Sequence, residues 1–179
     1  IMGNPPFVGA RIMSAEQKAD VLSVFGKIKN VGNLDYVCCW YKKAVDFMEN
    51  TAIRTALVST NSVSQGEQVA ILWKPLYEKG VHIDFAHRTF RWDSEAKIKA
   101  HVHCVIIGFS VAPYHRKKIL FSSERPQFVA NINGYLVDAE DVFIEGRNKP
   151  LCDVPEIGIG NMPIDGGNYL FTEEEKKNL

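Results

Sequence analysis

The 179-residue sequence has no excess of charge of either sign, because 21 basic and 21 acidic residues leave a formal net charge of zero. A surface devoted entirely to nucleic acid usually carries a clear basic excess, so charge alone names no partner. The sequence also lacks an apolar run near the roughly 18 residues that cross a bilayer, and its start is not typical of a signal peptide. These absences predict a globular chain with one core and no membrane partner.

Cysteines are few and follow no metal-binding pattern. Cys38, Cys39, Cys104 and Cys152 show no CxxC spacing, which is the spacing typical of zinc and redox sites. Cys38 and Cys39 lie in an apolar helical pattern, which favours buried free thiols over disulfides. We therefore expect a reducing, cytoplasmic setting.

Helix signals divide the first half of the chain. Ser14 begins a capping box with the glutamine three residues later, Asp35 is positioned to cap a second helix, and Ser64 begins a second capping box. Pro75 is expected to kink the third helix or to shift its boundary, and Gly80 is its natural C-cap. The three predicted helices cover residues 14–25, 36–49 and 66–80.

Apolar runs between these helices predict strands. Residues 53–60 ("IRTALVST") and 101–110 ("HVHCVIIGFS") read as buried strands, and residues 81–92 ("VHIDFAHRTFRW") as a strand that runs into an aromatic loop. The helix between the first and second strands predicts a parallel crossover. The linker at residues 93–100 is too short for another crossover, so the last strand is expected to return antiparallel. This arrangement predicts an α/β fold with a mixed sheet.

The pattern of predicted elements changes after Pro113. "KKILF", "FVANI" and "YLVD" are short strand candidates, and Asn133-Gly134 is a strong turn signal. Thr172 and Glu175 form a capping box that opens a last helix. The sequence therefore predicts a mostly β segment after the α/β part.

"GNPPF", at positions 3–7, is the most informative short motif. Asn4 precedes the rigid pair Pro5 and Pro6, and Phe7 follows directly. The two prolines cannot continue a helix or sit in a central strand. They hold the backbone extended, so the polar and aromatic groups beside them are ordered in advance.

Such a preorganised motif suits chemistry on the exocyclic amine of a nucleobase, which is a poor nucleophile because its lone pair is conjugated into the ring. The side-chain oxygen of Asn4 and the carbonyl of Pro5 can accept the two amine protons and direct the lone pair outward. Phe7 offers a flat face for stacking, worth roughly 1–3 kcal/mol. A base inside a duplex reaches such a pocket only when it is flipped out.

The motif does not stand alone. "LDYVCCWYKKA", "LVSTNSVSQGEQVAILW", "IDFAHRTFRW", "CVIIGFS", "YLVDA" and "KPLCDVPEIGIGNMPIDGG" follow "GNPPF" in that order. Together these segments resemble the MmeI-like adenine-specific DNA methyltransferases of bifunctional type II restriction–modification enzymes. The resemblance covers nearly the whole chain.

The resemblance implies a fold, a reaction and a set of residues. Residues 1–118 would be the C-terminal portion of a Rossmann-like class I methyltransferase domain, and residues 119–179 the start of a mostly β target-recognition region. The implied reaction transfers a methyl group from S-adenosyl-L-methionine to the N6 amine of adenine in a specific site of double-stranded DNA, without a metal. Asn4, Pro5, Pro6 and Phe7 would hold the adenine, with Asn61 in the loop after the next strand. Phe90, and second Trp92, would enclose the flipped base.

The resemblance also implies what the chain does not contain. The glycine-rich cofactor loop and the acidic residue for the ribose belong to the N-terminal half of the methyltransferase domain, before the NPPF motif. That missing half is an expected partner, and the fragment is expected to be inactive alone. The cofactor-binding residues therefore remain unknown from this sequence.

Two other functions stay open at this point. The same motif serves methyltransferases that act on RNA bases or on protein glutamine. A different class is a non-catalytic DNA-recognition module, in which the NPPF turn is only structural. The oligomeric state and the DNA sequence recognised are not predicted by these residues.

Overall fold

The computed structural model describes residues 1–92, 102–113, 116–122, 125–147, 149, 152–154 and 172–177. The chain divides into two compact units, Ile1–Glu145 and Gly146–Leu179. In the second unit, α4 (Glu173–Lys176) begins at the predicted capping box, where Thr172 and Glu175 bond to one another's backbone N–H groups. No helix in the described ranges is long and apolar enough to span a membrane.

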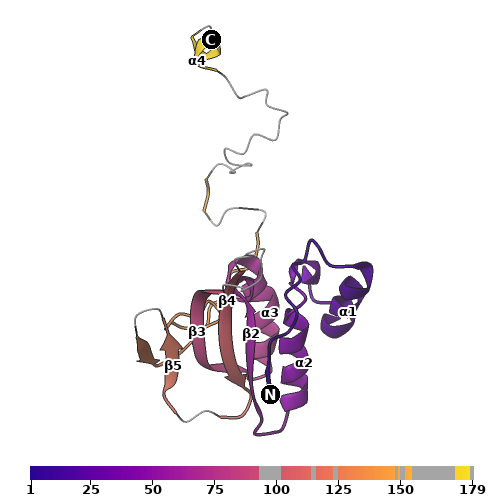
Figure 1. Ribbon diagram of the computed structural model, residues 1–179, viewed down its shortest axis with the longest axis vertical. Coiled ribbons are helices and arrows are strands. Elements are labelled where there is room, and N and C mark those ends of the chain that lie inside the picture. Colours follow the sequence, from indigo (N-terminus) through magenta and orange to yellow (C-terminus); the bar gives the residue numbers. More distant parts are fainter. Residues whose placement is uncertain are drawn as a thin grey trace. The chain divides into compact units, whose positions relative to one another are not determined.

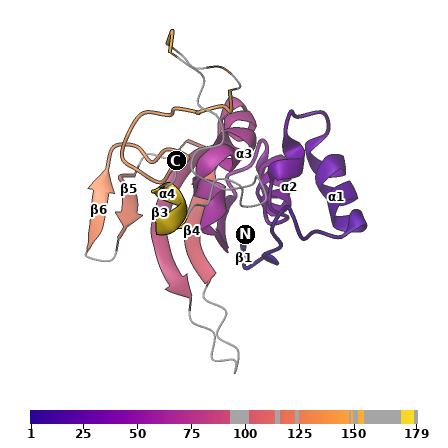
Figure 2. The ribbon, with the colours of Figure 1, turned by 90° about the horizontal axis from the view of Figure 1, so that it is seen from above.

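The first unit contains a mixed sheet. Among the described residues the strands are β1 (Met2–Gly3), β2 (Arg54–Thr60), β3 (His82–Trp92), β4 (Val102–Ser110), β5 (Lys118–Phe121) and β6 (Pro126–Val129). Their order is β1-β2-β4-β3-β5-β6, and several of them are seen side by side in Figure 2. β4 is antiparallel to β2 and β3, whereas β1 is parallel to β2 and β5 is parallel to β3. The predicted α/β class with a mixed sheet is confirmed.

The strand predictions are confirmed with two corrections. β4 returns antiparallel to β3 as predicted, and β2 runs parallel to β3, although β4 lies between them. β3 continues to Trp92, so the predicted aromatic loop is strand, because its residues still pair with β4. The predicted strand at residues 135–138 is wrong. There the Asn133 side chain accepts backbone N–H groups from Tyr135 and Val137, so the chain turns instead of pairing. The predicted linker at residues 93–100 lies outside the described residues.

The first helix follows its predicted local signal, and the second does not. α1 (Ala15–Phe25) begins at the Ser14 capping box. α2 (Cys38–Met48) has Val37 as its N-cap, with no side-chain cap. The predicted cap, Asp35, is therefore wrong, because its carboxylate bonds to the backbone of Ala10 and to the hydroxyl of Ser62 just beyond β2.

The third helix also begins differently from the prediction. α3 (Gly66–Glu78) starts after Gln65, and the predicted cap Ser64 instead donates to the carbonyl of Asn61 within the short 3-10 helix η2 (Asn61–Ser64). Pro75 lies inside α3, which continues beyond it, so the predicted boundary shift does not occur. Gly80 follows the helix with a φ of 84° and donates its N–H to the carbonyl of Tyr77, as expected of a residue that ends a helix.

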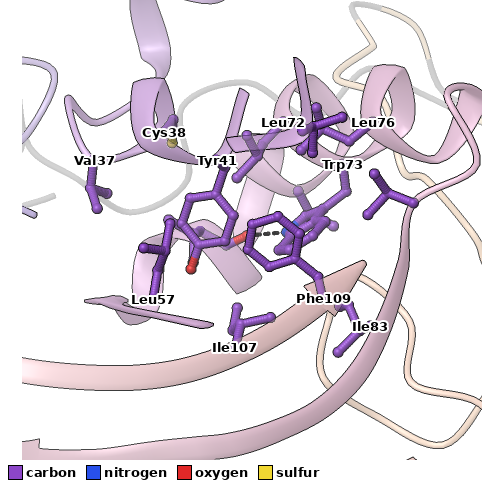
Figure 3. Packing of buried hydrophobic residues seen from close by; sticks show 14 of the residues in the cluster. Val37, Cys38, Tyr41, Leu57, Leu72, Trp73, Leu76, Ile83, Ile107 and Phe109 are labelled. Carbon is purple, nitrogen blue, oxygen red and sulfur yellow. Dashed lines mark hydrogen bonds between the residues drawn. The ribbon is translucent and has the colours of Figure 1, made fainter. Parts of the chain in front are cut away.

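The core lies between the sheet and the pair α2 and α3, which Figure 1 shows beside the strands, with α1 beyond α2. Tyr41 of α2 stacks on Phe109 of β4 at 5.2 Å, and Trp73 of α3 meets both rings edge-on (Figure 3). The indole N–H of Trp73 donates to the carbonyl of Val63 at 2.8 Å, and the Tyr41 hydroxyl is 2.6 Å from that of Ser59. The aromatic cluster therefore holds the connection between β2 and α3 against the core through these two hydrogen bonds.

The cysteines are free, as predicted, but not all are buried. Cys38, Cys39 and Cys104 are buried, whereas Cys152 is exposed. Burial raises the pKa of the Cys39 thiol to about 11. Burial, together with the nearby Asp35 carboxylate, raises the pKa of Cys38 well above its ordinary value. Both thiols are therefore neutral near pH 7 and unsuited to nucleophilic chemistry.

Candidate active site at the carboxyl edge of the sheet

The strand register brings the predicted site residues to one edge of the sheet. Gly3, directly before Asn4, pairs with Leu57 in the parallel strand β2. Thr60, directly before Asn61, pairs with Cys104 of β4, and Cys104 pairs with Phe90 of β3. Because the carboxyl ends of parallel strands share one edge, the segments that follow β1 and β2 and the end of β3 lie along it. Ligands of open α/β sheets usually bind at this edge.

The NPPF segment exposes a polar side chain and is held to the core by other residues of the segment. Asn4 and Pro6 are exposed, Pro5 is buried, and Phe7 is half-buried and packs against the core. Directly after it, the carbonyl of Val8 accepts the N–H of Tyr36 at 2.9 Å. The segment thus leaves the sheet edge with its backbone fixed and the Asn4 amide free to face solvent or a ligand.

The connection between β2 and α3 is tied to the same region by one carboxylate. Asp35, which is 9% exposed, accepts the N–H of Ala10 at 2.9 Å through Oδ1. Its Oδ2 accepts the hydroxyl of Ser62 at 2.5 Å, and the Thr60 hydroxyl lies 3.5 Å away. The Thr60 and Ser62 hydroxyls are themselves 2.8 Å apart. Asn61 is half-buried between these two residues, within the bonded turn.

Aromatic rings line the carboxyl end of β3. The ring of His87 meets Phe90 edge-on at 4.8 Å, and Phe90 lies 6.1 Å from Trp92. The register with β4 shifts between His87 and Phe90, as in a β-bulge, which re-aims the residues beyond it. Phe90 is half-buried and Trp92 is 48% exposed. A flat ring at this end of the sheet is therefore accessible to a ligand.

An open hollow of about 810 Å³ adjoins the anchored segment. It is bordered by residues 9–12 after the NPPF segment, by Asp35, and by residues 65–68 at the start of α3. Within the described ranges no cluster of His, Cys, Asp and Glu could hold a metal ion. What the edge offers a ligand is hydrogen-bond acceptors, hydroxyl groups and aromatic faces.

Comparison with known proteins identifies the family to which the chain belongs. A family model described as the DNA-methyltransferase domain of MmeI matches residues 1–122, and one described as the target recognition domain of MmeI matches residues 138–179. The chain belongs to the MmeI family of DNA methyltransferases. Its mixed α/β sheet is consistent with the Rossmann-like fold of such enzymes.

Two relatives support the same assignment. DNA methyltransferase A of Bacillus subtilis (strain 168) is 44% identical over 175 residues, covering 98% of this chain and 20% of the relative. The structure of the type IIL restriction–modification enzyme MmeI in complex with DNA is 47% identical, with a TM-score of 0.85, covering 99% of this chain and 25% of that one. The chain therefore spans about a fifth to a quarter of the length of these relatives.

Local motifs mark most of the candidate site residues, but no motif marks the residue that joins them. Asn4–Phe7, Asn61, Phe90 and Trp92 all lie along the same edge. The joining role of Asp35 was not predicted, because its partners lie 25 and 27 residues away in the sequence. Its position before an apolar helix suggested only a helix cap. No local sequence signal could have predicted its distant hydrogen-bond partners.

Proposed function

We propose that the full-length protein containing this chain transfers a methyl group from S-adenosyl-L-methionine to the N6 amine of adenine in a specific site of duplex DNA, as part of a restriction–modification enzyme. The observation that carries the proposal is the placement of the anchored NPPF segment and the accessible rings of β3 at one edge of a sheet, in a member of a DNA methyltransferase family. The structure of MmeI in complex with DNA supports DNA as the partner.

In this proposal, the chain acts on the methyl acceptor. The Asn4 side-chain oxygen and the Pro5 carbonyl accept the two amine protons and hold the nitrogen with its lone pair outward. Phe7, Phe90 and Trp92 supply faces between which a flipped adenine can stack, and Asn61 borders the same edge.

The cofactor has a separate role in the proposed reaction. S-adenosyl-L-methionine, when bound, supplies an electrophilic methyl group on a positively charged sulfur. The amine nitrogen, with its lone pair directed outward by Asn4 and Pro5, would accept this methyl group and would then lose a proton to solvent. No step needs a metal or a strong base from this chain.

The family models match residues 1–122 and 138–179, and the domain boundary that we propose lies close to the end of the first match. We assign residues 1–118 to the methyltransferase domain and residues 119–179 to the start of the target-recognition region. We also expect the 179-residue chain alone to be inactive, because the glycine-rich cofactor loop that the family resemblance implies is not among its residues. A cytoplasmic location follows from the proposed DNA substrate and the free cysteines.

The proposal is tested with Asn4→Ala in the full-length protein. Removal of one preorganised acceptor at a reacting centre typically costs about 10²–10³ in rate. DNA affinity should change far less, because contacts with the phosphate backbone supply much of it. The measurement is single-turnover methylation of a duplex carrying the recognition site, with the dissociation constant for DNA determined at the same salt concentration.

Two further variants make this test specific. Asn4→Asp keeps an acceptor oxygen and should lose less activity than Asn4→Ala. Asn50→Gly is the matched control, because it removes another exposed amide, before the amino end of β2, at a φ of 58° that glycine adopts readily. Methylation by Asn4→Ala within about threefold of wild type would refute the two-acceptor mechanism. Methyl transfer to RNA or to glutamine peptides in place of duplex DNA would refute the proposed substrate.

A further inference from the structure

We propose that Asp35 is a positioning residue for methyl transfer. Its buried carboxylate holds the segment that follows the NPPF motif against the carboxyl end of β2, and so fixes the separation of the two loops that border the adenine. This inference rests on the proposed function, and it assigns a role to a residue outside the motif.

The first half of the connection joins Asp35 to the catalytic segment. Oδ1 accepts the N–H of Ala10 at 2.9 Å, and the next residue, Tyr36, donates its N–H to the carbonyl of Val8 at 2.9 Å. These two bonds hold the backbone one and three residues after Phe7. The NPPF segment is therefore held between β1 on one side and Asp35–Tyr36 on the other.

The second half joins the same carboxylate to β2. Oδ2 accepts the hydroxyl of Ser62 at 2.5 Å and lies 3.5 Å from the hydroxyl of Thr60. Thr60 is the last residue of β2 and is linked through Cys104 of β4 to Phe90 in the strand register. One carboxylate thus joins the NPPF segment, which carries the proposed acceptor groups, to the loop that contains Asn61. Through the strand pairing it is also linked to Phe90.

The backbone of Asp35 adds a third tie. Its N–H donates to the side-chain oxygen of Gln68 in the first turns of α3 at 3.2 Å. Within the described part of the chain, no Lys or Arg side chain forms an ion pair with Asp35, so neutral donors alone compensate its burial. Burial of a carboxylate among neutral donors is costly unless its hydrogen bonds are made. Those bonds are the ones that set the loop geometry.

The sheet offers a matched control in a second buried aspartate. Asp84, which is 3% exposed, accepts the hydroxyl of Ser110 at 2.8 Å and the guanidinium of Arg54 at 2.9 Å. It lies near the amino end of β3, whereas Asp35 serves the carboxyl edge. Asp84→Ala therefore removes a comparable set of buried hydrogen bonds far along the strands from the proposed active site.

The experiment compares both aspartates in the full-length protein. Single-turnover methylation, DNA affinity and melting temperature are measured for wild type, Asp35→Ala, Asp35→Asn and Asp84→Ala. Base flipping is followed by the fluorescence of 2-aminopurine at the target position. Because a displacement of 1 Å at a reacting centre can cost about 10²-fold, Asp35→Ala should methylate about 10²-fold more slowly with DNA affinity within threefold of wild type. Asp84→Ala should lower the melting temperature yet methylate within threefold of wild type.

Asp35→Asn and Ser62→Ala provide graded tests that do not depend on the alanine variant folding. Asp35→Asn keeps the acceptor for Ala10 and should recover most of the rate, and Ser62→Ala removes one donor and should lose several-fold. The inference is overturned if Asp35→Ala is no slower than Asp84→Ala, or, where Asp35→Ala does not fold, if Ser62→Ala methylates at the wild-type rate. Failure of the proposed function looks different, because the wild-type protein itself would then not methylate adenine in duplex DNA.

Discussion

Gly108→Ala should destabilise the sheet because the Phe85 ring occupies the space that a side chain would need. Gly108 lies in β4, paired with Phe85 of β3 and with Ala56 of β2. A methyl group on Gly108 would lie 2.6 Å from Cζ of Phe85 and closer still to two other ring carbons. Carbon atoms in good contact are about 3.5–4.0 Å apart, so the half-buried ring must move by about 1 Å or more.

The expected magnitude combines two opposing terms. Forcing an extra methyl into a packed site typically costs about 1–3 kcal/mol. Replacing a strand glycine by alanine returns roughly 0.5–1 kcal/mol, because glycine loses more backbone freedom on folding. We expect a net loss of about 1–2 kcal/mol, which corresponds to a roughly 5- to 30-fold larger equilibrium population of the opened sheet. The measurement is hydrogen exchange of the amides of β3 and β4 in the full-length protein, which reports local opening.

A double-mutant cycle separates the ring from other causes. In a Phe85→Ala background the clash is absent, so Gly108→Ala should stabilise the sheet by about 0.5–1 kcal/mol. Gly32→Ala is the control for the substitution itself, because a methyl there meets no atom within 4 Å. Equal destabilisation by Gly108→Ala in both backgrounds would refute the reasoning.

Two further outcomes follow from buried groups. Trp73→Phe leaves the carbonyl of Val63 without its indole donor, so exchange in α3 and η2 should reveal a loss of about 1–3 kcal/mol; unchanged exchange would show that this bond contributes nothing. In thiol labelling at pH 8, Cys152 should react as an exposed thiol. Cys39, with a pKa of about 11, is about one thousandth thiolate at that pH and should label far more slowly until the pH approaches 11. Equal labelling rates would contradict the buried placement.

Local signals in the sequence predicted the elements whose formation depends on neighbours in the chain. The Ser14 and Thr172 capping boxes begin α1 and α4 as predicted, because the groups that satisfy one another lie three residues apart. The short linker after β3 correctly predicted an antiparallel return, since chain length alone limits where β4 can pair. The NPPF motif marked a candidate site, because its rigidity is a property of adjacent prolines.

Competing hydrogen-bond partners, some near in the sequence and some distant, overturned the other local predictions. Asp35 and Ser64 had the residue types of helix caps, yet their side chains bond to Ala10 and Ser62, and to Asn61. A polar side chain bonds to whichever partners lie within reach. For Ser64 that partner is three residues away, whereas for Asp35 only folding brings the partners close. The strand expected at residues 135–138 failed for a local reason, because the Asn133 side chain accepts the backbone N–H groups of Tyr135 and Val137 in a turn.

The sequence by itself determined the α/β class, most of the element positions and the motif at the candidate site, since periodicity, chain length and proline geometry act locally. Only the tertiary structure decided that β4 lies between β2 and β3, that Phe85 covers Gly108, and that Asp35 joins the segment after the NPPF motif to the end of β2. The physical reason is that sheet order, ring packing and buried hydrogen bonds depend on residues that are distant in the chain and meet only on folding.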